Sequence, residues 1–274
     1  MRKFVIALFI GCLTITALFT LQALTRVLSV DMDLPTKEIS QTDSKRLVLI
    51  TDQVGTPSYD RIVKGAKAAA IKQGMALEVL GYANQNDEAL LTDLERSIYA
   101  KVDGIIVQGK DTEAFKELTK VKAAFYSIPV VTISEDVPIE ESLRRTYVGS
   151  NHFQMGQTLA NVVTEDYQAD ETVVIYYDET RPFYQRERLR GAEAVLNESD
   201  LTVRYIGLPS STDEAILATQ RALNQYPTFD AVMMLDAKLS PIVIEEIKRR
   251  RQIEPLGIYT FDEQRNLDPL LKQE

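Results

Sequence analysis

Polar residues collect directly after the predicted strands of this chain, where they could hold a ligand. Four of these strands end in an aspartate, namely Asp52, Asp178, Asp236 and Asp262. Carboxylate oxygens accept hydrogen bonds from paired hydroxyl groups, which is the chemistry that a sugar requires. Arg186 adds a guanidinium fork that can donate to ring and hydroxyl oxygens. An aspartate in this position is about as often a helix N-cap, so the set favours a ligand site more than any one member does.

Other kinds of chemistry have less support in the sequence. The chain contains one cysteine, Cys12, and one histidine, His152, so an internal disulfide, a Cys/His zinc cluster and a Cys–His dyad are excluded. Dinucleotide-binding, P-loop and nucleophile-elbow motifs are missing. We therefore expect no cofactor and no catalytic residue, although a fold of this kind does not by itself exclude an enzyme. His152 is expected to be exposed or to cap a helix.

Strands and helices alternate along most of the chain. Apolar runs predict strands at residues 46–52, 76–82, 104–108, 129–134, 172–178, 201–208, 231–236 and 256–262, with a short strand before Gly149-Ser150-Asn151. Helical spacing predicts helices at residues 62–72, 88–101, 113–126, 155–167, 186–197, 213–225 and 241–250. This alternation indicates an α/β fold with parallel sheets, whose strands all have their carboxyl ends on one edge.

So many strands are better divided between two sheets than placed in one. We expect a first lobe over residues 46–150 and a second lobe over residues 151–274, each of ordinary domain size. Residues 30–45 form a polar linker. Residues 1–29 form a membrane anchor or signal segment.

The amino-terminal segment has the pattern of a membrane helix. Arg2 and Lys3 precede a run without charge from Phe4 to Leu24, and about 20 apolar residues span a bilayer. We expect a single-pass protein with its soluble part outside the cytoplasm. A cleaved signal peptide and a lipoprotein signal at Cys12 are the alternatives. The net charge of −9 and the pI near 4.9 argue against a nucleic-acid partner.

The chain resembles the type I periplasmic sugar-binding proteins, the ribose-binding-like family, from about Arg46 to Asp262. The segments that carry the resemblance are Gly65–Ala69, Val102–Ile106, Pro129–Ile133, Tyr147–Asn151 with Gly156, Arg186–Arg188 with Gly191, and Phe261-Asp262. The resemblance implies two Rossmann-like lobes, joined by a hinge, that close on a small polar ligand, usually a monosaccharide.

The resemblance also implies which residues contact the ligand. These are Thr56, Ser58, Tyr59, Ser134 and Glu135 in the first lobe, with Arg186, Asp236 and Asp262 in the second. The ribose-binding pattern has Asp-Arg where this chain has Ser134-Glu135, and Asn where it has Asp236. Acceptors thus replace donors, so a pentose preference is not carried over and an amino-bearing ligand becomes compatible with the site.

The function that follows is an extracytoplasmic solute-binding protein that serves an ABC permease or a histidine kinase by hinge closure. Family members continue well beyond the strand that ends at Asp262, so we expect the first lobe to lack its carboxyl-terminal completion. A degenerate or truncated non-binding member is therefore one alternative. A regulator of the lactose-repressor type without its DNA-binding domain is another, and an enzyme on a doubly wound fold is a third.

Overall fold

The computed structural model describes residues 13–14, 16–20, 44–52, 54–83, 86–236, 239–250 and 256–261. Residues 44–274 form one unit and residues 1–43 another. In the unit of residues 1–43, the described residues 13–14 and 16–20 are helical and exposed. In the part of the chain that the structure describes, no helix combines the length and the hydropathy of a membrane span. Most of the expected anchor, Phe4–Leu24, lies outside the described residues.

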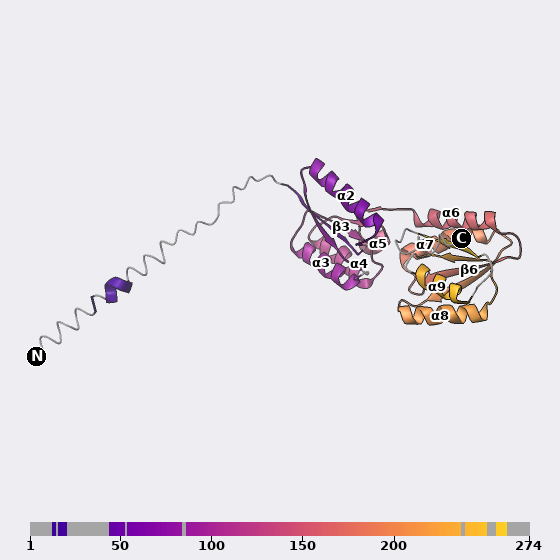
Figure 1. The fold of residues 1–274 in the computed structure, drawn as a ribbon. Helices are drawn as coiled ribbons and strands as arrows, with labels where there is room; N and C mark the ends of the chain where they lie inside the picture. Colours follow the sequence, from indigo (N-terminus) through magenta and orange to yellow (C-terminus); the bar gives the residue numbers. More distant parts are fainter. Residues whose placement is uncertain are drawn as a thin grey trace, which may run out of the picture. The chain divides into compact units, whose positions relative to one another are not determined.

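The larger unit contains two parallel sheets, which confirms the predicted fold class of two Rossmann-like lobes (Figure 1). The first sheet has the order β2-β1-β3-β4-β5, and every neighbouring pair is parallel. Its strands are β1 (Arg46–Thr51), β2 (Ala76–Gly81), β3 (Gly104–Gln108), β4 (Val130–Ile133) and β5 (Thr146–Val148). Because β1 lies between β2 and β3, the strand order reverses at the β1/β3 pair.

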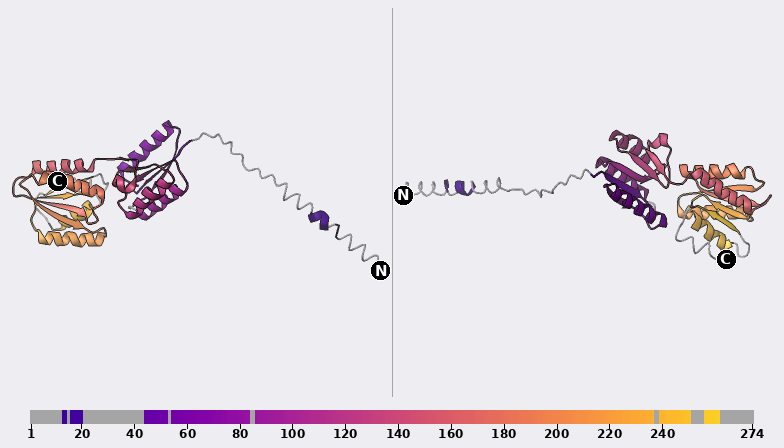
Figure 2. Two further views of the ribbon diagram at one scale, coloured as in Figure 1. Left: turned by 180° about the vertical axis from the view of Figure 1, so that it is seen from behind. Right: turned by 90° about the horizontal axis from the view of Figure 1, so that it is seen from above.

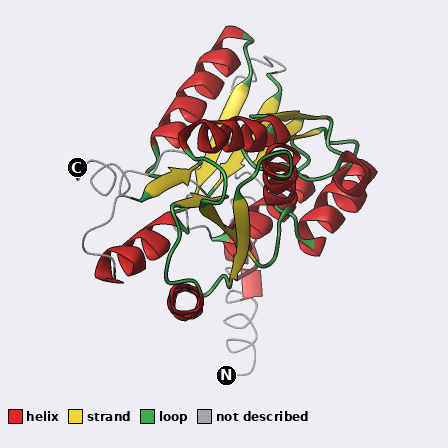
Figure 3. Cartoon of the chain, turned by 90° about the vertical axis from the view of Figure 1, so that its right-hand side faces the viewer, coloured by secondary structure: helices red, strands yellow, loops and turns green. Residues whose placement is uncertain are grey.

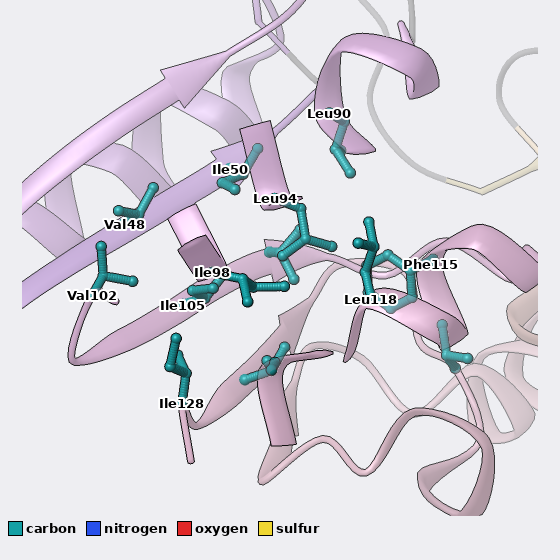
Figure 4. Packing of buried hydrophobic residues seen from close by; sticks show 14 residues of the cluster. Val48, Ile50, Leu90, Leu94, Ile98, Val102, Ile105, Phe115, Leu118 and Ile128 are labelled. Carbon is teal, nitrogen blue, oxygen red and sulfur yellow. The ribbon is translucent and has the colours of Figure 1, made fainter. Parts of the chain in front are cut away.

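Helices cover both faces of this first sheet. They are α2 (Pro57–Lys72), α3 (Asp87–Tyr99), α4 (Glu113–Lys116), the π-helix η1 (Glu117–Ala123) and α5 (Ile139–Ser142). One face packs against α3, α4 and η1 around fully buried side chains such as Ile50, Leu94 and Phe115 (Figure 4). Burial of each such side chain contributes about 1.5–3 kcal/mol, so this cluster fixes the sheet on which the site is built.

The second sheet has the order β7-β6-β8-β9 and is also parallel throughout. Its strands are β6 (Thr172–Asp178), β7 (Thr202–Leu208), β8 (Ala231–Met234) and β9 (Gly257–Thr260). Helices α6 (His152–Asp166) and α7 (Phe183–Leu196) cover one face, and α8 (Thr212–Gln225) and α9 (Ser240–Arg250) cover the other (Figures 1 and 2). Alternate residues of β6 point to the two faces, with Val173 and Ile175 in one core and Val174 and Tyr176 in the other.

Several helices begin earlier than the apolar spacing predicts. Helix α2 begins at Pro57 because Thr56 is its N-cap, accepting a hydrogen bond from Tyr59 N at 3.1 Å, and proline is favoured at a first helical position. Helix α6 begins at His152 after the cap Asn151. The predicted helix at residues 113–126 is instead α4 followed by η1. Figure 3 shows these helices in red around the yellow strands.

Two glycines let α6 and α7 approach each other closely. A Cβ atom on Gly156 would lie 2.0 Å from Arg188 O, and one on Gly191 would lie 2.0 Å from Phe153 O. These glycines are reciprocal, because each helix backbone fills the space that a side chain on the other would need. The contact therefore fixes the position of α7, which carries Tyr184, Gln185 and Arg186.

We predict that Gly156→Ala lowers the free energy of unfolding by about 3 kcal/mol or more, because the methyl group must displace the backbone of α7. Gly65→Ala is the matched control in α2, since no atom lies within 4 Å of its Cβ position, and it is expected to stabilise by about 0.5–1 kcal/mol. Urea unfolding of the full-length variants measures both changes. Equal effects of the two substitutions would contradict this view of the helix contact.

Candidate functional site

The carboxyl edge of the first sheet gathers polar groups at the point where its strand order reverses. In open parallel sheets, ligands bind outside the carboxyl ends of the strands at this position. Strand β1 is followed by Asp52, β3 ends at Gln108 and is followed by Lys110, and β4 is followed by Ser134-Glu135. The site is thus assembled from three neighbouring strand ends.

Lys110 lies at the centre of this group and is buried. Its Nζ donates to Asp52 Oδ2 at 2.6 Å and lies 3.0 Å from Asp87 Oδ1 and 3.5 Å from Glu135 Oε2. Asp52 is also buried, and its Oδ1 makes no hydrogen bond with any described residue. Three carboxylates from separate segments therefore share one ammonium group. We call Asp52, Asp87, Lys110 and Glu135 the lysine cluster.

The charges of the cluster determine the protonation of Lys110. Burial acts to lower its pKa, but the nearby charges of Glu135, Asp52 and Asp87 outweigh burial and raise the pKa well above the ordinary value of 10.5. Lys110 consequently stays positively charged at neutral pH. Its contribution to stability is fully present below pH 10.5 and is lost only as the pH rises through the raised pKa.

Gln108 connects the three strand ends through its side-chain amide. Its Oε1 accepts from Thr51 Oγ1 at 2.9 Å and from Asp52 N at 3.3 Å, and its Nε2 donates to Glu135 Oε1 at 3.0 Å. The next residue, Gly109, donates its N–H to Glu135 O at 3.2 Å. A Cβ atom at Gly109 would lie 2.4 Å from that oxygen. Only glycine therefore allows the loop that carries Glu135 to come this close.

The carboxyl edge of the second sheet presents a different set of hydrogen bonds. Asp236, which follows β8, accepts from Tyr184 Oη and, at 3.0 Å, from Gln185 Nε2. Gln185 Oε1 in turn accepts from Asp178 N at the end of β6 at 3.0 Å. Burial raises the pKa of Tyr184 well above its ordinary value, and the charges of Glu135 and Asp236 raise it further. Tyr184 therefore stays a neutral donor between carboxylates.

Asp111 joins the two lobes. Its Oδ2 accepts from Phe183 N, the first amide of α7, at 2.9 Å and lies 3.1 Å from Arg186 Nη1. Its Oδ1 lies 2.9 Å from Lys116 Nζ, and that lysine also contacts Glu141. The side chain of Asp111 is only 7 % exposed although that of Arg186 is 47 % exposed. The loop after β3 thus contacts the arginine that the resemblance assigns to the ligand.

The structure places the predicted site residues in several environments. Glu135 belongs to the lysine cluster, Ser134 lies beside it with φ 60°, and its carbonyl accepts from Tyr147 Oη at 2.8 Å. Thr56 caps α2, and Ser58 and Tyr59 lie in the first turn of that helix rather than in a loop. Asp236 and Arg186 lie at the edge of the second sheet, whereas Asp262 is outside the described residues. Asp178 accepts from Thr180 N and Oγ1 in a local turn.

The expectation for His152 was wrong. The residue is only 6 % exposed, and the capping residue is its neighbour Asn151. His152 Nε2 forms a hydrogen bond with Tyr147 Oη at 2.9 Å, and its ring lies between Tyr147 and Tyr184. A tyrosine from the first sheet and one from α7 bury this histidine, which a single-residue interpretation of the sequence could not foresee.

Sequence analysis missed Lys110, Asp87, Gln108 and Asp111. The signal for three of them was present, because Gln108 ends the third predicted strand and Gly109-Lys110-Asp111 follow it directly. Within the first lobe, ligand groups were expected after the first and fourth strands but not after this one. Asp87 offered no such signal, since it enters the site from the start of α3.

The family model of the periplasmic binding protein domain matches residues 47–265. The chain belongs to the periplasmic binding protein family. Its two parallel-sheet lobes are of type I in this family, as in its sugar-binding members. The comparison with curated proteins found no significant match.

Solved structures of this family resemble the chain over most of its length. GanP, a glucose-galactose binding protein from Geobacillus stearothermophilus, is 26 % identical with a TM-score of 0.73, covering 83 % of this chain and 81 % of GanP. A chain of the XylFII-LytSN complex is 26 % identical with a TM-score of 0.67, covering 81 % of each chain. A solute-binding protein from Agrobacterium vitis bound with alpha-D-tagatopyranose is 19 % identical with a TM-score of 0.71, covering 84 % of this chain and 80 % of that chain, and supports the fold alone.

We predict that Lys110→Met lowers the free energy of unfolding by roughly 3–5 kcal/mol at neutral pH, because buried carboxylates lose their counter-charge. Lys64→Met, at an exposed position of α2, is the control and should change stability by less than about 0.5 kcal/mol. Denaturant unfolding at neutral pH measures both, and a loss no larger than that of the control would show that the cluster is not a stabilising centre.

We predict that Asp111→Ala loosens the contact between the lobes, because Phe183 N and Arg186 lose their shared acceptor. Spin labels on exposed positions, Lys67 in α2 and Glu214 in α8, should report a longer and broader distance distribution in a Cys12→Ser background. Glu113 is another carboxylate paired with Lys116, and its side chain is 94 % exposed. Glu113→Ala should therefore leave the distribution unchanged. The same distribution in wild type and Asp111→Ala would refute the role of this contact.

Proposed function

We propose that the protein is an extracytoplasmic solute-binding protein that takes a sugar or a similar small polar ligand between two lobes. The observation that carries the proposal is the concentration of buried and half-buried hydrogen-bonding groups on the carboxyl edges of both parallel sheets. Each edge combines carboxylates with a cation or a neutral donor, namely Lys110 in the first and Tyr184 in the second. Such paired donors and acceptors suit a ligand with several hydroxyl groups.

The proposed ligand contacts come from both lobes, residues 46–150 and residues 151–274. Thr56, Ser58, Tyr59, Ser134 and Glu135 supply the first side, and Arg186, Asp236 and Asp262 supply the second. Lys110 and Gln108 hold Glu135 in place rather than forming a reaction centre, since each is bonded to groups of the protein itself. The protein binds its ligand without transforming it, and hinge closure of the lobes is the event that a partner detects.

Two kinds of partner could respond to this hinge closure. An ABC permease would receive the ligand, whereas a sensor histidine kinase would respond to the closed lobes. Similarity to a chain of the XylFII-LytSN complex, at 26 % identity over 81 % of each chain, supports the second route. An anchor over Phe4–Leu24 would keep the protein beside such a membrane partner, and this run without charge is the support for a location at the outer face of the cell membrane.

We predict that at least one monosaccharide of a neutral panel raises the melting temperature of the full-length protein in a concentration-dependent way. A ligand at 100 times its Kd that binds only the folded state adds about 2.7 kcal/mol to the free energy of unfolding. Calorimetric titration should then give a saturable heat that Arg186→Ala and Asp236→Ala weaken by about ten-fold or more, which is a loss of about 1.4 kcal/mol each.

Arg190→Ala is the control for the arginine. Arg190 lies one turn further along α7, where it pairs with Glu187 at 2.7 Å. Its removal should leave the affinity unchanged. A well-folded protein that binds no member of the panel would favour the alternative of a degenerate, non-binding family member.

A further inference from the structure

The amino edge of the first sheet, opposite the edge that carries the lysine cluster, exposes large apolar side chains. The strands of this sheet are all parallel, so their first residues lie together on this edge. Ile71 in the last turn of α2, Tyr99 at the end of α3 and Phe125 just after η1 are 79 %, 55 % and 79 % exposed. Each of these helices leads into the start of the next strand. Exposed apolar side chains that gather in this way mark an interaction surface.

Two of these side chains belong to one aromatic group. The ring centroid of the half-buried Tyr126 lies 6.2 Å from that of Tyr99 and 5.1 Å from that of Phe125, and both contacts are edge-to-face. Lys101 Nζ lies 5.5 Å from the same Tyr126 centroid. Packing against Tyr126 therefore holds two exposed rings beside a cation. Tyrosine is enriched at the interface between a membrane and water, because its ring is apolar and its hydroxyl group is polar.

Cations accompany the apolar side chains on the amino edge. Lys72 is the last residue of α2, Lys101 lies just before β3 and Arg145 directly precedes β5, and all three are exposed. None of the three forms an ion pair with another residue that the structure describes. The carboxylate of Asp103 is also on this edge, where it accepts from the backbone amide of Arg46 at 2.7 Å. Cations thus outnumber carboxylates among the described residues of this edge.

The lysines at the carboxyl edge of the same sheet are paired in a different way. Lys110 and Lys116 each lie within 3.5 Å of three carboxylates. The cations of the amino edge are instead available to an external anion. The whole chain carries a net charge of −9, but at physiological ionic strength charges act over only about 8 Å. The local charge of the amino edge therefore decides which surface it contacts, and it is complementary to an anionic partner with an apolar layer.

The chain itself leads from the amino edge to the run that we propose as a membrane anchor. Arg46 begins β1 on this edge, where its Nη2 donates to Ala100 O at 3.3 Å. Nineteen residues, 25–43, separate the uncharged run Phe4–Leu24 from the larger unit. Even fully extended, they span no more than about 65 Å. A tether of this length keeps the amino edge at a high local concentration near the bilayer, so a weak contact is sufficient.

We propose that the amino edge of the first lobe docks on the surface of an anionic lipid bilayer. The residues that make this contact are Ile71, Lys72, Tyr99, Lys101, Phe125 and Arg145. The inference rests on the proposed membrane location and adds an orientation to it. The apolar side chains lie at the level of the lipid headgroups, and the cations lie beside acidic phosphate groups. Because the strands run from this edge to the carboxyl edge, the ligand groups of the first lobe face away from the bilayer.

Fluorescence quenching in vesicles tests the proposal with the full-length chain in a Cys12→Ser background. A fluorophore is attached at Ala124→Cys, an exposed position beside Phe125, or at Glu113→Cys, where α4 begins on the opposite edge and the native side chain is 94 % exposed. The vesicles contain phosphatidylcholine alone or an equimolar mixture with phosphatidylglycerol, and a quencher is attached to a fraction of the lipid headgroups. In the anionic vesicles, we expect the label at position 124 to be quenched at least about three-fold more strongly than the label at position 113, and the ratio should fall in neutral vesicles.

Two double variants connect the quenching to the cations of the edge. Lys101→Glu with Arg145→Glu should lower the ratio between the two labels in anionic vesicles to less than about 1.5-fold, because the edge becomes acidic. Lys64→Glu with Arg221→Glu makes the same change in net charge at exposed positions of α2 and α8 and should leave the ratio intact. Melting temperatures close to that of the wild type establish that both variants are folded.

The possible outcomes separate the docking surface from the membrane location. Protein that floats with the vesicles but shows equal quenching at the two positions, equal ratios in neutral and anionic vesicles, or a ratio that the edge variant leaves unchanged would overturn the docking surface alone. Protein that does not float with the vesicles would overturn both. Energy transfer between labels at position 124 of different copies in detergent would show that a second copy covers the edge, and would overturn the assignment to lipid.

Discussion

The ammonium group of Lys110 is buried at the carboxyl edge of a parallel sheet. The carboxylates that balance its charge determine how that edge is built. Asp52 from the end of β1, Glu135 from the loop after β4 and Asp87 from the start of α3 must all approach it. Gln108 and Gly109 supply the hydrogen bonds and the space that make this convergence possible. Moving the end of β1 away from Lys110 would separate two buried and oppositely charged side chains, which is among the most costly changes in a protein interior.

The second lobe meets this edge through α7, whose position depends on backbone contact rather than on charge. Gly156 and Gly191 allow α6 and α7 to pack with their backbones almost in contact. The first turn of α7 then presents Phe183 N to Asp111, and Tyr184 and Gln185 to Asp236. Close helix packing and the polar edge are therefore linked, since the glycines fix the helix that carries the donors.

The layered fold was largely readable from the sequence, whereas the site was readable only in part. Apolar runs such as Thr172–Asp178 are buried between two helical layers, so their pattern carries the fold directly. The carboxyl-end rule located Asp52, Glu135 and Asp236 at the correct edges because it depends only on strand direction. It could not reveal that Lys110 joins Asp52 and Asp87, because those contacts link residues far apart in the chain.

His152 shows the same limit. Its neighbours along the chain suggest a helix cap, but Tyr147 and Tyr184 bury it from two different elements. Thr56, which the family resemblance assigns to the ligand, is also the cap of α2. Local patterns therefore predict caps and strands, and tertiary contacts decide which polar side chains meet.

A crystal structure of the full-length protein with its tightest-binding sugar would show whether the ligand lies at the carboxyl edges of the two sheets. We expect a ligand held between the lobes, with a hydroxyl group about 3 Å from the Glu135 carboxylate and with Lys110 still bound to Asp52. A ligand bound away from these edges, or one that does not contact Glu135, would contradict the proposed binding site.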